Sequence, residues 1–237
     1  AADPDAMAVL GMLYEQHLVP DAALSITSDD LAFSLYRESE RGGSLIGQYY
    51  LALAHYYGYP STDQYNSERL NELLEDIDLE SSNFDLLAVK GNAILQGRID
   101  MPAGETRSNF EYGEALLRRA NESCPEDGIS AGNLGLFLLS FYGPRTEQGQ
   151  EGMALLEASD FPSFKETLAM LYRYGSLDGT NNYFTNSFVD LPKAIELYRT
   201  DAPKGNPDSA YALYEMWMDQ EDLSGELISR ELAQEML

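Results

Sequence analysis

Apolar and small residues recur along this chain at helical spacing, and the whole pattern repeats about every forty residues. Each period contains an apolar run with one small residue, or once a tyrosine, near its centre. The runs cover residues 10–14, 51–54, 90–94, 134–138, 168–172 and 213–217. Within them, apolar residues lie three and four positions apart and so share one face of a helix. The pattern predicts one helix for each run.

A second helix follows in each period. From Ala32 the chain has the order Ala-x-x-Leu-Tyr-Arg and reaches Gly43, and the same order starts at Ala194 and reaches Gly205 at the same offset. Weaker copies begin at Leu70, Gly113 and Gly152. Each period therefore predicts a helical hairpin.

A single hairpin buries only part of its apolar surface, so hairpins of this kind are stable only when they stack on their neighbours. We therefore predict an all-α chain: an α/α superhelical solenoid of about five to six helical-hairpin repeats, forming one domain over residues 1–237. Small residues such as Gly11 and Gly135 would let neighbouring helices approach closely. The repeats are expected at approximately 5–43, 44–83, 84–128, 129–160, 161–205 and 206–237.

The paired patterns are similar to a known family. The stretches from Leu10 to Gly43 and from Leu168 to Gly205, with an aspartate before each second helix, resemble the Sel1-like repeat (SLR) family of tetratricopeptide-like solenoids. In the middle of the chain His55 replaces the aromatic residue of the pattern and Lys90 replaces a leucine. The resemblance implies an adaptor or scaffold fold, and it transfers no catalytic residue to this chain.

The charge of the chain limits the classes of partner that it can bind. Fifteen Lys and Arg residues stand against 40 Asp and Glu residues, for a formal net charge of −25. An acidic surface repels phosphate backbones, so we expect no nucleic-acid binding. The excess of acid instead favours a protein or peptide partner that is basic, and it would equally suit a salty environment.

Location is only weakly indicated by the sequence. No run of eighteen apolar residues is present, so no membrane span is expected. The chain begins Ala1-Ala2-Asp3-Pro4, without a charged start and an apolar segment, so we expect any signal peptide to have been removed or never to have existed. Because similar bacterial proteins are often exported, a periplasmic, envelope or secreted location is predicted, with the cytoplasm as the alternative.

Candidate chemistry is sparse. Cys124 is the single cysteine, and His17 and His55 are too few for a zinc site, which normally needs three or four ligands. Neither a phosphate-binding loop nor a nucleophile elbow is present. Asn121-Glu122-Ser123 matches a glycosylation sequon. We predict no catalytic, cofactor-binding or metal site, and a protein that is not an enzyme.

The sequence favours a scaffold that binds a partner on its concave face, which the first helices of stacked hairpins line. Positions three before and one and four after each core-facing small position form a stripe there. These residues are Tyr49, Leu53 and Tyr56; Glu166, Met170 and Arg173; and Tyr211, Glu215 and Met218. Such Tyr and Met side chains are typical of adaptable interfaces, but they would equally serve in packing. Two alternatives remain, an assembly subunit of a cell-envelope complex and an acid-dependent hydrolase.

Overall fold

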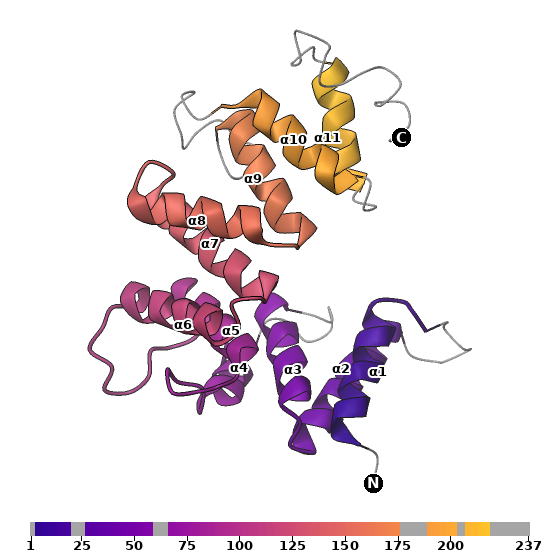
Figure 1. The fold of residues 1–237 in the computed structure, drawn as a ribbon. Coiled ribbons are helices and arrows are strands. Elements are labelled where there is room, and N and C mark those ends of the chain that lie inside the picture. The colour runs from indigo at the N-terminus through magenta and orange to yellow at the C-terminus, as the bar shows by residue number, and fades with distance from the viewer. Residues whose placement is uncertain (1–2, 20–26, 59–65, 176–188, 203–206, 219–237) are drawn as a thin grey trace. The chain divides into compact units, whose positions relative to one another are not determined.

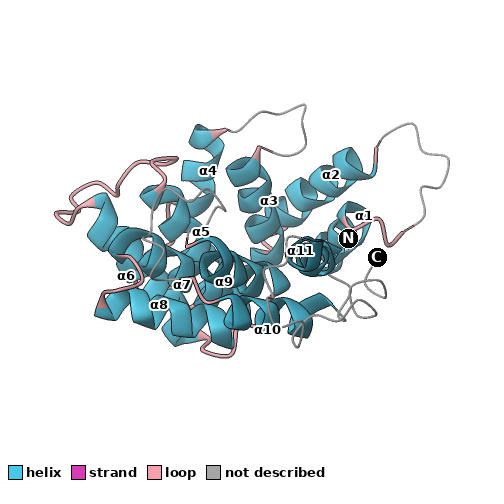
Figure 2. Cartoon of the chain, turned by 90° about the horizontal axis from the view of Figure 1, so that it is seen from above, coloured by secondary structure: helices cyan, strands magenta, loops and turns pink. Residues whose placement is uncertain are grey.

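The computed structural model describes residues 3–19, 27–58, 66–175, 189–202 and 207–218, and within these ranges it contains helices and no strands (Figures 1 and 2). The all-α prediction is therefore confirmed. The chain divides into two compact units, Ala1–Cys124 and Pro125–Leu237. The first unit holds α1 Pro4–Glu15, α2 Ser28–Arg41, α3 Leu45–Tyr57, α4 Ser67–Leu74, α5 Phe84–Leu95 and α6 Asn109–Ser123. The second holds α7 Gly128–Tyr142, α8 Glu147–Ala158, α9 Pro162–Tyr174, α10 Leu191–Asp201 and α11 Pro207–Met218.

Local sequence signals set the ends of these helices. Ser108 caps α6 with a complete capping box, in which its side chain accepts from the backbone N–H of Glu111 and the Glu111 carboxylate accepts from the backbone N–H of Ser108. α3 and α9 end at Gly58 and Gly175, which have φ angles of 77° and 73°. Glycine adopts this left-handed conformation without a steric penalty, so the two helices stop there.

Consecutive helices of the first unit pair as hairpins: α1 with α2, α3 with α4, and α5 with α6. α3 also packs against α1, α2 and α5. At the crossing of α5 and α6, an added Cβ on Gly91 would lie 3.0 Å from the carbonyl oxygen of Gly113. The small residue expected inside this repeat therefore lies where the two backbones come closest.

Lys90 occupies a position where the repeat pattern has leucine, and the structure explains the exchange. The side chain is buried at 4% exposure, and its Nζ donates to the carbonyl oxygens of Leu74 at 2.8 Å and of Ile77. These carbonyls lie at and just beyond the end of α4, where backbone oxygens have no partner within the helix. Burial lowers the pKa of Lys90, and nearby carboxylates act in the opposite direction. The lysine therefore caps the short helix α4.

The second unit follows the same plan. α7 pairs with α8 and α9 with α10, while α11 packs against α10. Gly135 of α7 and Gly152 of α8 face each other, since an added Cβ on either would lie 2.8 or 2.7 Å from the carbonyl oxygen of the other. A core that includes Leu156, Leu168 and Tyr198 connects the helices. Hairpins thus recur in both units as predicted, whereas one continuous domain over residues 1–237 stays a prediction.

Candidate functional site

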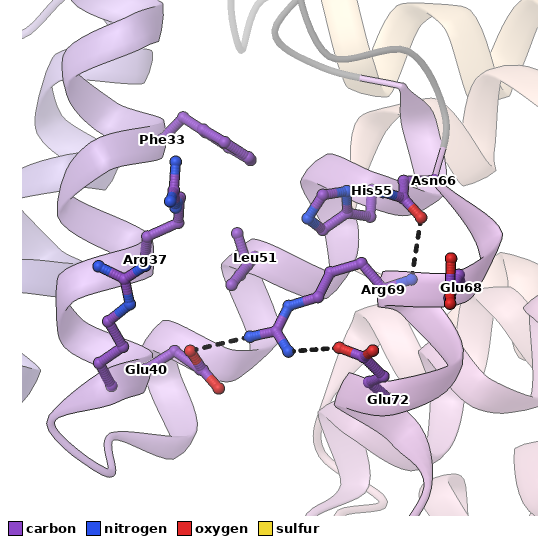
Figure 3. Close-up of a pocket in the computed structure, with 10 residues that line it drawn as sticks. Phe33, Arg37, Glu40, Leu51, His55, Asn66, Glu68, Arg69 and Glu72 are labelled. Atoms are coloured by element: carbon purple, nitrogen blue, oxygen red, sulfur yellow. Dashed lines mark hydrogen bonds and ion pairs between the residues drawn. The ribbon is translucent and has the colours of Figure 1, made fainter.

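A groove of about 490 Å³ opens in the first unit between α2 and α4, with α3 as its floor (Figure 3). The α2 wall consists of Phe33, Arg37, Glu40 and Arg41, whose spacing places them on one face of the helix. The opposite wall is formed by Asn66 and the first turns of α4, including Glu68, Arg69 and Glu72. Second helices of two successive hairpins therefore form the two walls.

The floor of the groove is buried. Leu51 and His55 lie one helical turn apart on α3 and are 1% and 7% exposed. The ring of Phe33 meets the ring of His55 edge to face, with centroids 5.6 Å apart and planes at 76°. His55, which replaces the aromatic residue of the pattern, therefore packs as an aromatic residue would.

Arg69 joins the two walls. Its Nη2 lies 3.1 Å from Oε2 of Glu40 on α2, and its Nη1 lies 2.7 Å from Oε2 of Glu72 on α4, as the dashed lines in Figure 3 show. The side chain of Asn66 accepts from the backbone N–H of Arg69 at 2.9 Å and so caps α4. The hydrogen bond to Glu72 is the largest of the effects that raise the pKa of Arg69. Its charge is balanced inside the groove.

The remaining charges of the groove are segregated by wall. Arg37 and Arg41 are exposed on α2, and neither forms an ion pair with a residue that the structure describes. The guanidinium of Arg37 lies 5.9 Å from the centroid of the Phe33 ring. Glu68 and Glu72 are exposed on the α4 side. One wall is therefore basic and the other acidic, above a buried floor.

The predicted stripe is only partly exposed in the first unit. Tyr49 and Leu53 are half-buried on α3, whereas Tyr56 is 6% exposed. The guanidinium of Arg98 lies 4.7 Å from the centroid of the Tyr56 ring. Burial is the main cause that raises the pKa of Tyr56 to about 12. Tyr56 thus belongs to the packed interior rather than to an open surface.

In the second unit the structure brings two of the predicted residues together. Nη1 of Arg173 on α9 lies 3.3 Å from Oε2 of Glu215 on α11, and the arginine side chain is buried. Tyr211 and Met218 of α11 are both 55% exposed. Glu166 and Met170 of α9 are half-buried. The exposed part of the stripe in this unit therefore lies mainly on α11.

Other candidates from the sequence are placed as follows. Among the described residues no cluster of three or more His, Cys, Asp or Glu side chains has the arrangement of a metal site. The sequon asparagine, Asn121, lies within α6, and its buried Oδ1 has no hydrogen-bond partner among the described residues. Cys124 is half-buried at the end of the same helix. Gly205, and residues 219–237 of the last expected repeat, lie outside the described residues.

Sequence reasoning missed the groove because it examined the first helix of each hairpin, whereas the groove walls are second helices. A signal was present, since Arg37 and Arg41 lie one turn apart on a helix of an acidic chain. The sequence could not show that α4 would face them.

Comparison with known proteins adds to this picture. No protein-family model matches the chain, and no curated protein sequence matches it. Among solved structures, a Sel1 repeat protein from Oxalobacter formigenes superimposes with a TM-score of 0.53 at 18% identity, over 99% of this chain and 83% of the other. Pseudomonas aeruginosa 5086 (PA5086) gives a TM-score of 0.56 at 14% identity, over 98% of this chain and 79% of the other. The chain has a Sel1-like repeat fold. At such low identity the similarity shows the fold alone. Any role of the groove rests on the residues that line it in this chain.

The helices of this Sel1-like fold are short. Within the part of the chain that the structure describes, none is both long and apolar enough to cross a membrane.

Proposed function

We propose that this chain is an interaction scaffold that binds a protein or peptide partner on the first helices of its hairpins. The observation that carries the proposal is the exposure of large aromatic and apolar side chains there. Tyr57 of α3 is 72% exposed, and Tyr211 and Met218 of α11 are each 55% exposed. Exposed tyrosine and methionine side chains become favourable contacts when a partner removes them from water.

Within each unit taken by itself, the partner surface would combine these residues with others of the predicted stripe. Tyr49 and Leu53 in the first unit retain partial exposure, as do Met170 and Glu215 in the second. Tyr56 and Arg173 would support the surface from beneath, because both are buried. Stacked helical hairpins commonly present such surfaces, which supports a scaffold over other uses of this fold.

The net charge of the chain indicates which kind of partner it would attract. At a net charge of −25, a partner with complementary Lys and Arg residues would be attracted over the range of the Debye length, about 8 Å at physiological salt. The Sel1-like scaffold would thus attract a basic partner and hold it through aromatic contacts.

The test combines partner capture with two aromatic truncations. The chain is immobilised, proteins captured from native cells are identified, and each candidate is then purified and titrated by calorimetry. Tyr49→Ala together with Tyr211→Ala should weaken the affinity of the true partner at least about tenfold.

The matched control is Leu18→Ala with Val189→Ala, which truncates one exposed apolar residue of each unit outside its helices. The control variant should bind like the parent protein. Equal affinity for the parent, the tyrosine variant and the control would refute binding through the first helices.

A further inference from the structure

The groove between α2 and α4 is lined by none of the residues of the predicted stripe, and its walls carry opposite charge. Arg69 is neutralised by Glu40 and Glu72. On the α2 wall Arg37 and Arg41 remain, both exposed. Three of the 15 basic residues of the chain line this one groove. Glu40, Glu68 and Glu72 balance them, so the lining has no net charge in a chain whose formal net charge is −25.

The absence of ion pairs at Arg37 and Arg41 separates them from other arginines of the described chain. Arg107, Arg118 and Arg173 each lie within 3.3 Å of a glutamate oxygen. Arg37 and Arg41 are exposed, so their guanidinium donors can reach an external acceptor.

We propose that this groove binds an acidic segment of a protein partner, with carboxylates on Arg37 and Arg41. The inference rests on the proposed function, since it assumes that the chain binds a partner, and it assigns that partner a second, acidic contact.

The geometry of the wall fits an extended segment. Arginines one helical turn apart have Cβ atoms about 5–6 Å apart. Alternate side chains of an extended chain are spaced by about 6.6–6.8 Å and point the same way, so two carboxylates separated by one residue match the pair. The guanidinium fork accepts a carboxylate with two parallel hydrogen bonds, which favours carboxylates over neutral groups.

The acidic α4 wall sets the orientation. Carboxylates that faced Glu68 and Glu72 would be repelled, so the acidic side of the segment must lie toward α2. The buried floor of Leu51 and His55 lies beneath it. Long-range repulsion by the −25 charge is screened beyond about 8 Å at physiological salt, whereas the contacts at the arginines are shorter than that.

The experiment uses the full chain and two fluorescein-labelled peptides, Gly-Glu-Leu-Glu-Phe-Glu-Gly and its charge-reversed counterpart with lysine in place of glutamate. Binding is followed by fluorescence anisotropy. The acidic peptide should bind more tightly than the basic one. Arg37→Ala with Arg41→Ala should weaken its binding at least about tenfold.

Arg37→Lys with Arg41→Lys should give an intermediate affinity, because lysine keeps the charge but lacks the planar fork. Arg118→Ala with Lys165→Ala is the matched control, since it removes two positive charges outside the groove, and its affinity should stay within about twofold of the parent.

Four results would overturn the proposal: tighter binding of the basic peptide, no binding of the acidic peptide up to about 1 mM, an unchanged affinity in the double-alanine variant, or an equal loss in the control. Both peptides are also titrated into the Tyr49→Ala with Tyr211→Ala variant, which should bind the acidic peptide normally. Failure of the groove therefore leaves the proposed function standing, and failure of the tyrosine test leaves the peptide result standing.

Discussion

The crossing of α7 and α8 offers a sharp test of the repeat packing. A Cβ added to Gly135 would lie 2.8 Å from the carbonyl oxygen of Gly152, and 3.1 Å from atoms of Leu155 and Leu156. The nearest of these atoms belongs to the backbone of the opposite helix, so no change of side-chain rotamer can move it away. Any larger residue at 135 must push the two helices apart.

The expected magnitude follows from two opposed effects. Overpacking a buried site costs about 1–3 kcal/mol, whereas replacing a helical glycine by alanine or leucine favours the helix by about 0.8–1 kcal/mol. Gly135→Ala should therefore change the free energy of unfolding by about 0–2 kcal/mol, always toward instability. Gly135→Leu adds three further carbons to the same contact and should cost about 2 kcal/mol net, at the upper end of the overpacking range.

The assay is thermal and urea unfolding followed by far-ultraviolet dichroism. For a chain of this size, about 2 kcal/mol corresponds to a fall in the melting temperature of roughly 4–8 °C. Ser140→Leu is the control, because it places the same side chain at an exposed position of the same helix. A melting temperature of the Gly135→Leu variant at or above that of Ser140→Leu would refute close packing at this crossing.

Three further predictions follow from other parts of the structure. Lys90→Met should lower the free energy of unfolding by about 2–3 kcal/mol in urea titrations, because the carbonyls of Leu74 and Ile77 would lose a buried charged donor. Its control is Glu166→Met, which replaces a charged side chain by the same methionine at a half-buried site and should change the free energy of unfolding by less than about 1 kcal/mol. Tyr56 has a folded pKa of about 12 against 10.0 for an ordinary tyrosine, so its contribution to stability is complete below pH 10 and is lost toward pH 12. Denaturant titrations across this pH range should show that the Tyr56→Phe variant loses less unfolding free energy than the parent protein. An equal loss in the two proteins would contradict the raised pKa of Tyr56. Finally, the association rate of a basic partner should fall steeply as salt rises, given the −25 charge, and stopped-flow rates independent of salt would show that the acidity serves another purpose.

The sequence by itself determined the elements and their pairing. Helical spacing of apolar residues and small residues such as Gly91 and Gly135 place the hairpins, because these features act within one helix or between neighbours in the chain. Capping residues such as Ser108 set the helix ends for the same reason. Local rules therefore suffice for the fold class.

The tertiary structure decided which individual side chains on those helices are buried and which are exposed. Tyr56, Arg173 and Met218 occupy the same position of the repeat pattern, yet the first two are buried and the third is exposed. Lys90 departs from the repeat pattern because the end of α4 lies within reach of its Nζ. Which face of a helix remains open depends on neighbours from other hairpins, and the period of the pattern does not encode them.

The groove of Figure 3 was likewise decided by the tertiary structure. The sequence shows Arg37 and Arg41 one turn apart, but it does not show that Arg69 meets Glu40 across a gap between α2 and α4. Spacing along a helix follows from its period, whereas the distance between two helices depends on the side chains packed beneath them, here Leu51 and His55 of α3. The chain thus determines its helices locally, and only their packing determines where a partner can bind.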